Sequence, residues 1–286
     1  MTNRLCLIAI ALATTAQLAC SSRTATATQA TPPAFVPAQS DAKAIAVIDA
    51  MTEKLGGAAT FDGLKQIKFE MAYSLNGEVK GQFRHAWDRW NGRHRYEVVD
   101  MKTVAEAERE GNPSLVRALV VGYDLFERNK GFVSYGGQPA DSAEKKKRIA
   151  EAYERWQDDV YKLTFLYKLK DPGVVLKDKG KIKDQSGLCI PACDVVQVTF
   201  TDGVGTDVYY LNINETSKMP EVWQKAVKNS AGEEGRLGYK LTAWETIGGL
   251  QFPTRLQNLG VEGEIFVFGN IEIGEPDDSL YIPRVI

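Results

Sequence analysis

Histidine and cysteine, the residue types on which most metal sites and many catalytic sites depend, are scarce in this sequence. Only two histidines and four cysteines occur among the 286 residues. The chain also lacks a nucleophile elbow, a histidine-rich metal motif, a phosphate-binding glycine loop and a cysteine nucleophile with a free thiol. The sequence therefore predicts no enzymatic activity, no catalytic residue, no metal site and no cofactor.

Excess positive charge is also missing. The formal net charge is −2, which argues against nucleic acid as a partner. With 25% charged and 44% hydrophobic residues, the composition is that of a soluble protein with one large domain or two small ones.

The N-terminus has the features of an export signal. Arg4 precedes an apolar run at residues 5–13, which is too short to cross a bilayer, and small residues follow. We interpret residues 1–19 as a signal peptide. Residues 20–39, rich in Ser, Thr, Ala and Pro, are expected to form a flexible tether.

The end of this leader, Leu18-Ala19-Cys20, resembles the lipobox of bacterial lipoproteins, although Gln17 stands where that family usually has leucine. The resemblance implies that Cys20 is acylated and anchors the chain in a membrane. Ser21 in the next position implies the periplasmic side of the outer membrane. The alternative is a secreted or free periplasmic protein, cleaved after Ala19 or Ala27.

Residues 66–99 are predicted to form three antiparallel strands. Apolar and polar residues alternate in each of them, as expected when one face of a sheet is buried. The apolar face carries the residues that we predict to be available to a ligand, namely Phe69, Met71, Tyr73, Phe83, His85, Trp87 and Tyr96.

Asn-Gly pairs mark both turns between these strands. At residues 91–92 a two-residue turn would pair Trp87 with Tyr96 and His85 with Val98, so that like faces meet. This register separates His85 from His94 and puts the latter near the rim of the sheet, which argues against a shared metal ion.

A two-residue turn at residues 76–77 would instead invert the two faces. The sequence therefore predicts a three-residue loop at residues 75–77 that ends in a bulge at Gly77 and pairs Phe69 with Phe83 and Ile67 with His85.

The apolar face of this sheet needs a cover, because burying one large side chain is worth roughly 1.5–3 kcal/mol. The cover consists either of the protein's own helices or of helices together with an apolar ligand. One candidate helix, at residues 40–55, precedes the strands. A second begins at a capping box formed by Asp141 and Glu144 and extends through Val160, within a helical insertion at about residues 140–170.

From residue 173 onwards, strand-like runs recur about every ten residues, which is typical of an antiparallel sheet or open barrel. The sheet before the insertion is expected to continue in these strands. Cys189 and Cys193 lie between two of them, and in an exported protein we expect them to form a disulfide rather than a metal or redox pair.

This layout resembles the periplasmic lipoprotein-carrier (LolA/LolB-like) superfamily, and the segment AYERWQDDVYKLTFLYKLKDPGV is similar to one in uncharacterised exported proteins of that kind. The resemblance implies an α+β fold at residues 40–286, in which an antiparallel meander forms an open, unclosed barrel and helices cover its concave apolar face. No functional residue is carried over.

The function expected from this layout is the binding of a lipid or other hydrophobic molecule between sheet and helices by a membrane-anchored lipoprotein. A structural or assembly lipoprotein with a protein partner is the alternative from another class. An exported hydrolase is a third, which a cluster of buried, perturbed acids in a cleft would favour.

Overall fold

Antiparallel pairing unites strands from both ends of the chain in one sheet. The computed structural model describes residues 35–183, 187, 189–201, 206–228, 232 and 234–283. Its strands are β1 (Gln66–Leu75), β2 (Glu78–Asp88), β3 (Arg93–Val99), β4 (Ala118–Asp124), β5 (Gly131–Tyr135), β6 (Gln138–Pro139), β7 (Val174–Lys183), β8 (Ala192–Phe200), β9 (Tyr209–Asn214), β10 (Pro220–Lys228), β11 (Glu234–Ile247), β12 (Leu250–Asn258) and β13 (Glu264–Gly274).

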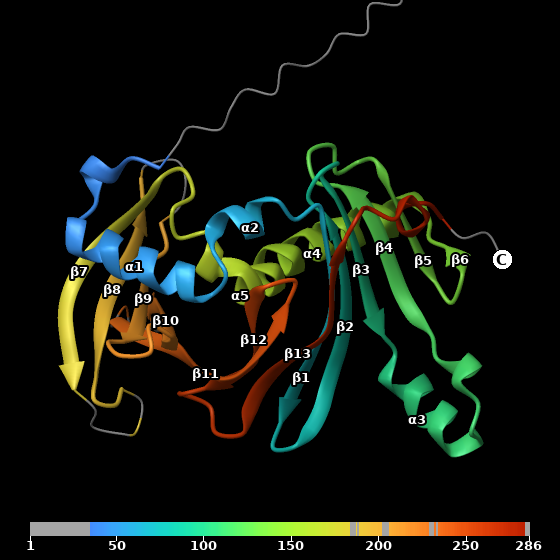
Figure 1. The fold of residues 1–286 in the computed structure, drawn as a ribbon. Coiled ribbons are helices and arrows are strands. Elements are labelled where there is room, and N and C mark those ends of the chain that lie inside the picture. Colours follow the sequence, from blue (N-terminus) through green and yellow to red (C-terminus); the bar gives the residue numbers. More distant parts are fainter. Residues whose placement is uncertain are drawn as a thin grey trace, which may run out of the picture. The chain divides into compact units, whose positions relative to one another are not determined.

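The strand order is β6-β5-β4-β3-β2-β1-β13-β12-β11-β10-β9-β8-β7. The first strand therefore lies beside the last, so the sheet continues across the helical insertion as predicted. The edge strands β6 and β7 do not pair with each other, so the barrel stays open. The predicted fold class, an open antiparallel meander with helices on its concave face, is confirmed (Figure 1).

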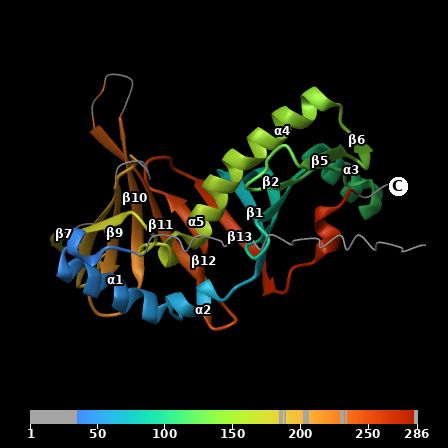
Figure 2. The same ribbon diagram turned by 90° about the horizontal axis from the view of Figure 1, so that it is seen from above.

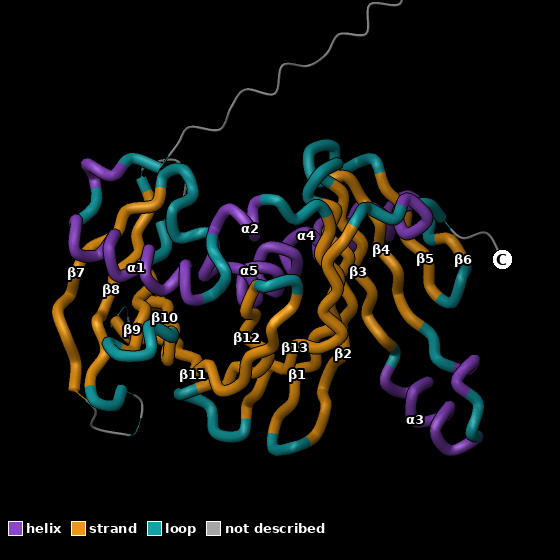
Figure 3. Tube along the Cα trace, in the orientation of Figure 1, coloured by secondary structure: helices purple, strands orange, loops and turns teal. Residues whose placement is uncertain are grey.

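Helical segments lie mainly inside the curve of the sheet (Figure 3). In the described residues they are η1 (Pro37–Gln39), α1 (Ala42–Lys54), α2 (Ala58–Asp62), α3 (Met101–Glu110), η2 (Pro113–Leu115), α4 (Ser142–Arg155), the π-helical segment η3 (Trp156–Val160), α5 (Tyr161–Thr164), η4 (Phe165–Tyr167) and η5 (Asp278–Tyr281). None of the described helices is long and apolar enough to span a membrane.

The larger apolar core fills the curve between β7 and β1. Helix α1 contributes a stripe at helical spacing, Ala44, Ile48 and Met51, all with no exposed surface. The segment from Val160 to Tyr167 packs on the same core. The Tyr167 hydroxyl lies 2.8 Å from the carbonyl oxygens of both Leu55 and Gln251, which ties the helical layer to β12.

A smaller core lies under α4 at the other end of the sheet. It consists of Tyr96, Val121, Tyr123, Val133, Ile149 and Ala152. Seen from above, α4 runs along this part of the sheet (Figure 2). A single helix, α4, thus covers the strands of the smaller core. The strands of the larger core are covered by α1, α5 and η4 together.

The prediction of a three-residue loop at residues 75–77 is wrong. The turn has two residues, Asn76 and Gly77, with φ of 52° and 82°, and Ser74 pairs with Val79. The extra residue is Lys80, which bulges out of β2 and restores the match of the faces. Face matching was therefore a sound constraint, but it did not specify on which side of the turn the correction would be made.

The loop between β2 and β3 also differs from the prediction, since it has four residues, 89–92. Asp88 pairs with Arg93, and its carboxylate accepts hydrogen bonds from the Asn91 backbone nitrogen at 2.8 Å and from the Arg93 Nε at 2.8 Å. These bonds stabilise the wider loop. The register shifts by two residues, so each side chain keeps its face but gains a different neighbour.

The second predicted helix begins as expected, because the Asp141 side chain accepts hydrogen bonds from the backbone nitrogens of Ala143 and Glu144. It does not continue as a regular α-helix to Val160. After Arg155 the chain forms η3, and the change of winding places Asp159 and Val160 in the interior.

Replacing Gly56 with alanine is predicted to destabilise the protein. Gly56 follows the C-terminal end of α1 and has φ of 107°. An added Cβ would lie 2.1 Å from the Gly249 carbonyl oxygen. Positive φ and overpacking together are expected to lower the free energy of unfolding by about 2–5 kcal/mol. Urea denaturation measures the change.

The control is Gly111→Ala, since Gly111 also has positive φ, 62°, but has nothing within 4 Å of the added atom. Its cost should stay near 1–2 kcal/mol. Equal losses in the two variants would show that the close approach of Gly56 to β12 contributes nothing.

Candidate functional site

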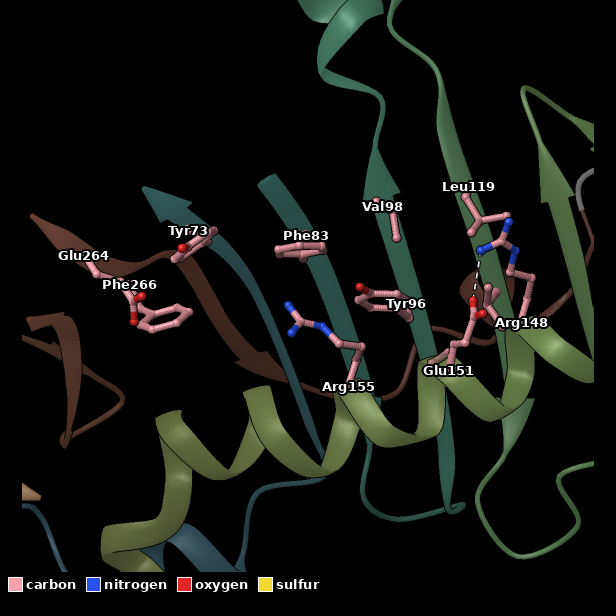
Figure 4. Close-up of a pocket in the computed structure, with 12 residues that line it drawn as sticks. Tyr73, Phe83, Tyr96, Val98, Leu119, Arg148, Glu151, Arg155, Glu264 and Phe266 are labelled. Carbon is pink, nitrogen blue, oxygen red and sulfur yellow. Dashed lines mark hydrogen bonds and ion pairs between the residues drawn. The ribbon is translucent and has the colours of Figure 1, made fainter. Parts of the chain in front are cut away.

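An apolar trough of about 580 Å³ lies between α4 and the strands β13, β1, β2, β3 and β4 (Figure 4). It is lined by Tyr73, Phe83, Tyr96, Val98, Leu119, Val121, Arg148, Glu151, Ala152, Arg155, Glu264 and Phe266. The trough lies where the two cores meet, since Phe83 packs against both of them.

Aromatic rings from four neighbouring strands form one part of the floor. Phe266 and Tyr73 have ring centroids 5.3 Å apart, and those of Phe83 and Tyr96 are 6.0 Å apart. The floor becomes aliphatic towards β4. These side chains share one face because each strand alternates apolar and polar residues, and neighbouring strands are paired so that like faces coincide.

The trough remains unfilled because few large side chains reach into it from above. Helix α4 presents Ala152 to the floor, which is a small side chain with no exposed surface. Gly81, opposite Tyr73 in β2, leaves room for the Phe83 ring to lie on the floor, since an added Cβ would lie 2.9 Å from that ring. Apolar surface that would otherwise be packed is therefore left open along the junction of the two cores.

Charged residues of α4 form one lip of the trough. Arg148, Glu151 and Arg155 follow one another at helical spacing and so lie on one side of the helix. The Arg148 Nε donates to Glu144 at 2.6 Å, and its Nη1 donates to Glu151 at 2.9 Å. Both ends of this guanidinium are thus occupied by carboxylates.

Arg155 has a different environment. Its guanidinium projects from α4 towards the sheet, 4.5 Å above the ring of Phe83, and its Nε lies 3.2 Å from the Asp159 carboxylate (Figure 4). Burial disfavours the charge, but attraction to Asp159 and a hydrogen bond with Tyr96 outweigh it, so the pKa of Arg155 is raised. Burial also raises the pKa of Tyr96, to about 12.

Beside the trough, four buried polar side chains form a chain that the sequence did not reveal. Asp159 lies 3.4 Å from the Nε2 of His85, the Nδ1 of His85 lies 3.2 Å from the Nε2 of His94, and the Nδ1 of His94 lies 3.0 Å from the Tyr123 hydroxyl. The predicted separation of the two histidines is therefore wrong, and so is the position of His94 at the rim, because its side chain has no exposed surface.

The two-residue shift in the second hairpin explains this result. His85 pairs with Tyr96, and His94 pairs with Trp87, so the histidines are diagonal neighbours on one face of the sheet. Diagonal residues on adjacent strands are close enough for long side chains to touch. The alternation of the sequence places both histidines on one face. Whether they are neighbours depends on the length of the loop, which the sequence left ambiguous.

This buried polar chain of four side chains joins η3 to β2, β3 and β4, but several of its polar atoms lack hydrogen bonds. In the described part of the protein these are the Nε2 of His85 and both carboxylate oxygens of Asp159. Burial lowers the pKa of His85, although Asp159 opposes the shift. Burial and the neighbouring His85 lower the pKa of His94 well below its ordinary value. Both rings are thus neutral near pH 7.

The predicted ligand-binding residues occupy four different places. Tyr73, Phe83 and Tyr96 line the trough, whereas Phe69 and Met71 are buried in the larger core. The two remaining residues, His85 and Trp87, lie outside both the trough and the buried core positions.

His85 belongs to the buried polar chain, and Trp87 lines a second pocket of about 240 Å³ together with Trp156. Sequence reasoning missed Phe266, the aliphatic part of the floor and the lip on α4. The helical spacing of Arg148, Glu151 and Arg155 was a signal for the lip, but nothing in the sequence shows which strands the helix crosses.

Cys189 and Cys193 form the predicted disulfide at the start of β8, which contains Cys193, with Cα atoms 5.2 Å apart. They lie far along the sheet from the trough, on a strand that does not line it. Among the described residues, no group of three or more His, Cys, Asp or Glu side chains could hold a metal ion. Cys20 lies outside the described residues.

Comparison with known proteins gives a single kind of likeness. No family model matches the sequence, and no curated protein matches it. Among solved structures, a LolA superfamily protein from Nitrosomonas europaea is similar, with 11% identity and a TM-score of 0.43 over 84% of this chain and 97% of that one.

The buried histidines are predicted to make stability depend on pH. Their pKa values are lower in the folded protein than in the unfolded chain, so the unfolded chain binds protons first as the pH falls. The free energy of unfolding should therefore decrease from pH 7.5 to pH 5.5, by at most about 1.4 kcal/mol for each histidine. Urea denaturation at the two pH values measures the decrease.

The matched variants are His94→Gln and the double variant His85→Gln/His94→Gln, which removes every histidine of the chain. Stability at pH 7.5 is expected to fall in both, because buried hydrogen bonds are lost. The difference between the two pH values should shrink in the first variant and nearly vanish in the second. An undiminished difference in the double variant would assign it to other groups.

Proposed function

We propose that this protein binds a lipid or another hydrophobic molecule in the trough between α4 and the sheet. The observation that carries the proposal is the aromatic and aliphatic floor, left open to a space of about 580 Å³. Ligand sites are typically concave, largely apolar and about 300–1,000 Å³ in volume, with a few polar groups at one side. The trough has this character, with its charged groups confined to the lip and to Glu264.

The remainder of the interior supports the trough rather than extending it. Between β7 and β1 the core is packed with fully buried side chains such as Phe61, Phe165 and Phe252. An alkyl chain would therefore contact the strands on either side of the β1–β13 junction and would not enter the larger core. The proposed ligand is held in a groove with a solid support behind it.

Anchoring through an acylated Cys20 completes the proposal. The tether at residues 20–39 would hold the folded part close to the periplasmic face of the outer membrane, where acyl chains are available. More than one acyl chain on Cys20 would make the attachment stable. The similarity to the lipobox supports this assignment, and Gln17 is the one departure from it.

A structural lipoprotein with a protein partner is the second candidate. Its favourable observation is a pair of exposed aromatic residues on neighbouring loops, Trp90 and Phe126, with 73% and 78% of their surface accessible. Phe126 packs beside Gly92 in the loop that contains Trp90. Exposed aromatic residues of this kind are enriched at contact surfaces.

The edges of the sheet give this alternative less support. Strand β6 has only two residues, and β7 carries Lys177, Lys179, Lys181 and Lys183. Lysines and short strands at a sheet edge disfavour the addition of another strand. At Leu176 the edge of β7 is also occupied, because its carbonyl accepts a hydrogen bond from the Asp41 backbone nitrogen at 2.9 Å.

A hydrolase, the third candidate, would require its buried acid to be reachable. Asp159 and His85 have no side-chain surface exposed, and Asp159 is engaged by Arg155. The buried polar chain accordingly positions η3 against the sheet in our proposal, and the trough beside it binds the ligand.

Filling the trough is predicted to abolish ligand binding. Val98 lies on its floor and is only partly buried, so Val98→Trp would place an indole in the space. The affinity of delipidated protein for the apolar fluorophore 1-N-phenylnaphthylamine, measured by fluorescence titration, should decrease at least tenfold, roughly the loss of 1.4 kcal/mol of binding free energy.

The control is Val79→Trp, which makes the same change at a 43% exposed position of β2 outside the trough. It should leave the affinity unchanged. If both variants bind as the wild type does, the fluorophore occupies another place and the proposed site is wrong. Mass spectrometry of protein purified without detergent then shows whether acyl-chain ligands accompany it at all.

Loss of Cys20 is predicted to release the protein from the membrane. In Cys20→Ser the acceptor for acylation is absent, so the protein should move from the membrane fraction to the soluble fraction and lose its lipid mass. The control is Cys6→Ser, which alters the leader but leaves Cys20 in place. Continued membrane association of Cys20→Ser would contradict the anchor. Binding in the trough is tested separately by the fluorescence titration.

A further inference from the structure

The trough is amphipathic across its width, and one cation on its lip is placed to select the ligand. Its floor is apolar, whereas α4 supplies Arg148, Glu151 and Arg155, and β13 supplies Glu264. Three of these four charged groups form close hydrogen bonds with other side chains. Arg148 is bound by Glu144 and Glu151, and the Glu264 carboxylate accepts a hydrogen bond from Asn258 at 2.7 Å.

Arg155 has partners too, but its carboxylates approach the Nε and, at a greater distance, the Nη1. The Asp159 carboxylate lies 3.2 Å from its Nε, and the Asp158 carboxylate is 4.0 Å from its Nη1. Asp158 is itself paired with Lys162. A guanidinium offers five N–H donors in a planar fork and can bind a second carboxylate at the edge that the first does not occupy.

The position of this fork matters as much as its charge. Figure 4 shows the Arg155 side chain leaving α4 in the middle of the trough and pointing at the aromatic part of the floor. Its Cζ lies 4.5 Å from the Phe83 ring centroid. Water is partly excluded there, since about one third of the side chain is exposed, and charge-assisted hydrogen bonds are stronger where water is scarce.

We propose that the trough binds a single-chain amphiphile with a carboxylate head, such as a long-chain fatty acid, and that Arg155 holds the head while the chain lies on the apolar floor. This inference rests on the proposed function, because it names the class of ligand for the same site. The Tyr96 hydroxyl, next to the guanidinium, is placed to donate to the same carboxylate.

The size of the trough agrees with one long acyl chain. A methylene group occupies roughly the volume of one water molecule in the liquid, about 30 Å³. A space of about 580 Å³ therefore accommodates on the order of twenty such groups. One long acyl chain with its head matches this size.

The experiment compares two ligands of equal chain length, hexadecanoate and hexadecan-1-ol, as competitors of 1-N-phenylnaphthylamine on the delipidated chain at pH 8. Wild-type protein should bind hexadecanoate more tightly than the alcohol. In Arg155→Gln the affinity for hexadecanoate should fall roughly 10- to 100-fold, the loss expected for a hydrogen bond to a charged group, with little change for the alcohol.

Lys147→Gln is the matched control, because it removes a positive charge from an exposed position of the same helix outside the trough. It should leave both affinities close to the wild-type values. Hexadecyltrimethylammonium, which has the same chain and a cationic head, should compete more weakly than the alcohol against wild-type protein.

Removing Arg155 leaves Asp159 buried without its cation, which could prevent folding. Arg155→Gln/Asp159→Asn removes both charges and is the second variant, and it should show the same selective loss of hexadecanoate affinity. Arg155→Lys keeps the charge without the fork and should lose less than Arg155→Gln. Thermal unfolding of each variant confirms that the compared proteins are folded.

The outcomes separate the two proposals. Equal affinity of wild-type protein for hexadecanoate and hexadecan-1-ol, or an equal loss of both in the Arg155 variants, would overturn the assignment of the head group and leave the hydrophobic site intact. Failure of both ligands to displace the fluorophore would overturn the proposed function itself.

Discussion

The pairing of β1 with β13 is the contact on which the rest of the structure depends. It joins Gln66 to Gly274 and Leu75 to Glu264, residues separated by about two hundred positions, and it makes one sheet from two meanders. Without it each meander would have an additional unpaired edge and would form only half of the curved surface. The trough lies across this junction, so the site exists only because the two ends of the chain meet.

The helical insertion between the two meanders turns that sheet into a container. Segment α5 belongs to the larger core and α4 to the smaller one, and η3 connects them with a different winding. Wide helical turns of this kind are frequent at functional sites. Here the turn brings Asp159 into the interior, beside His85 of β2, while Arg155 one turn earlier remains at the trough.

The two cores show how support and function are divided in this protein. The larger core is filled by close-packed side chains and supplies most of the apolar burial. The smaller core, under a single helix with Ala152 at its inner face, leaves surface open. A fully packed junction would stabilise the protein further, but it would leave no space for an alkyl chain.

The sequence by itself determined the strands, their alternation and the face each side chain occupies, because the two-residue period of a strand is a local property of the backbone. Phe69, Phe83 and Tyr96 were therefore assigned to the correct face. The helix cap at Asp141 and the disulfide between Cys189 and Cys193 followed from equally local signals.

Only the tertiary structure decided which residues on that face are neighbours and which of them remain accessible. One extra residue at Lys80 and a wider loop after Asp88 changed every partner without changing any face. The meeting of His85 with His94, and the placement of Arg155 over Phe83, depend on those registers and on the path of α4. Such choices are set by non-local contacts, whose free energy no short stretch of sequence contains.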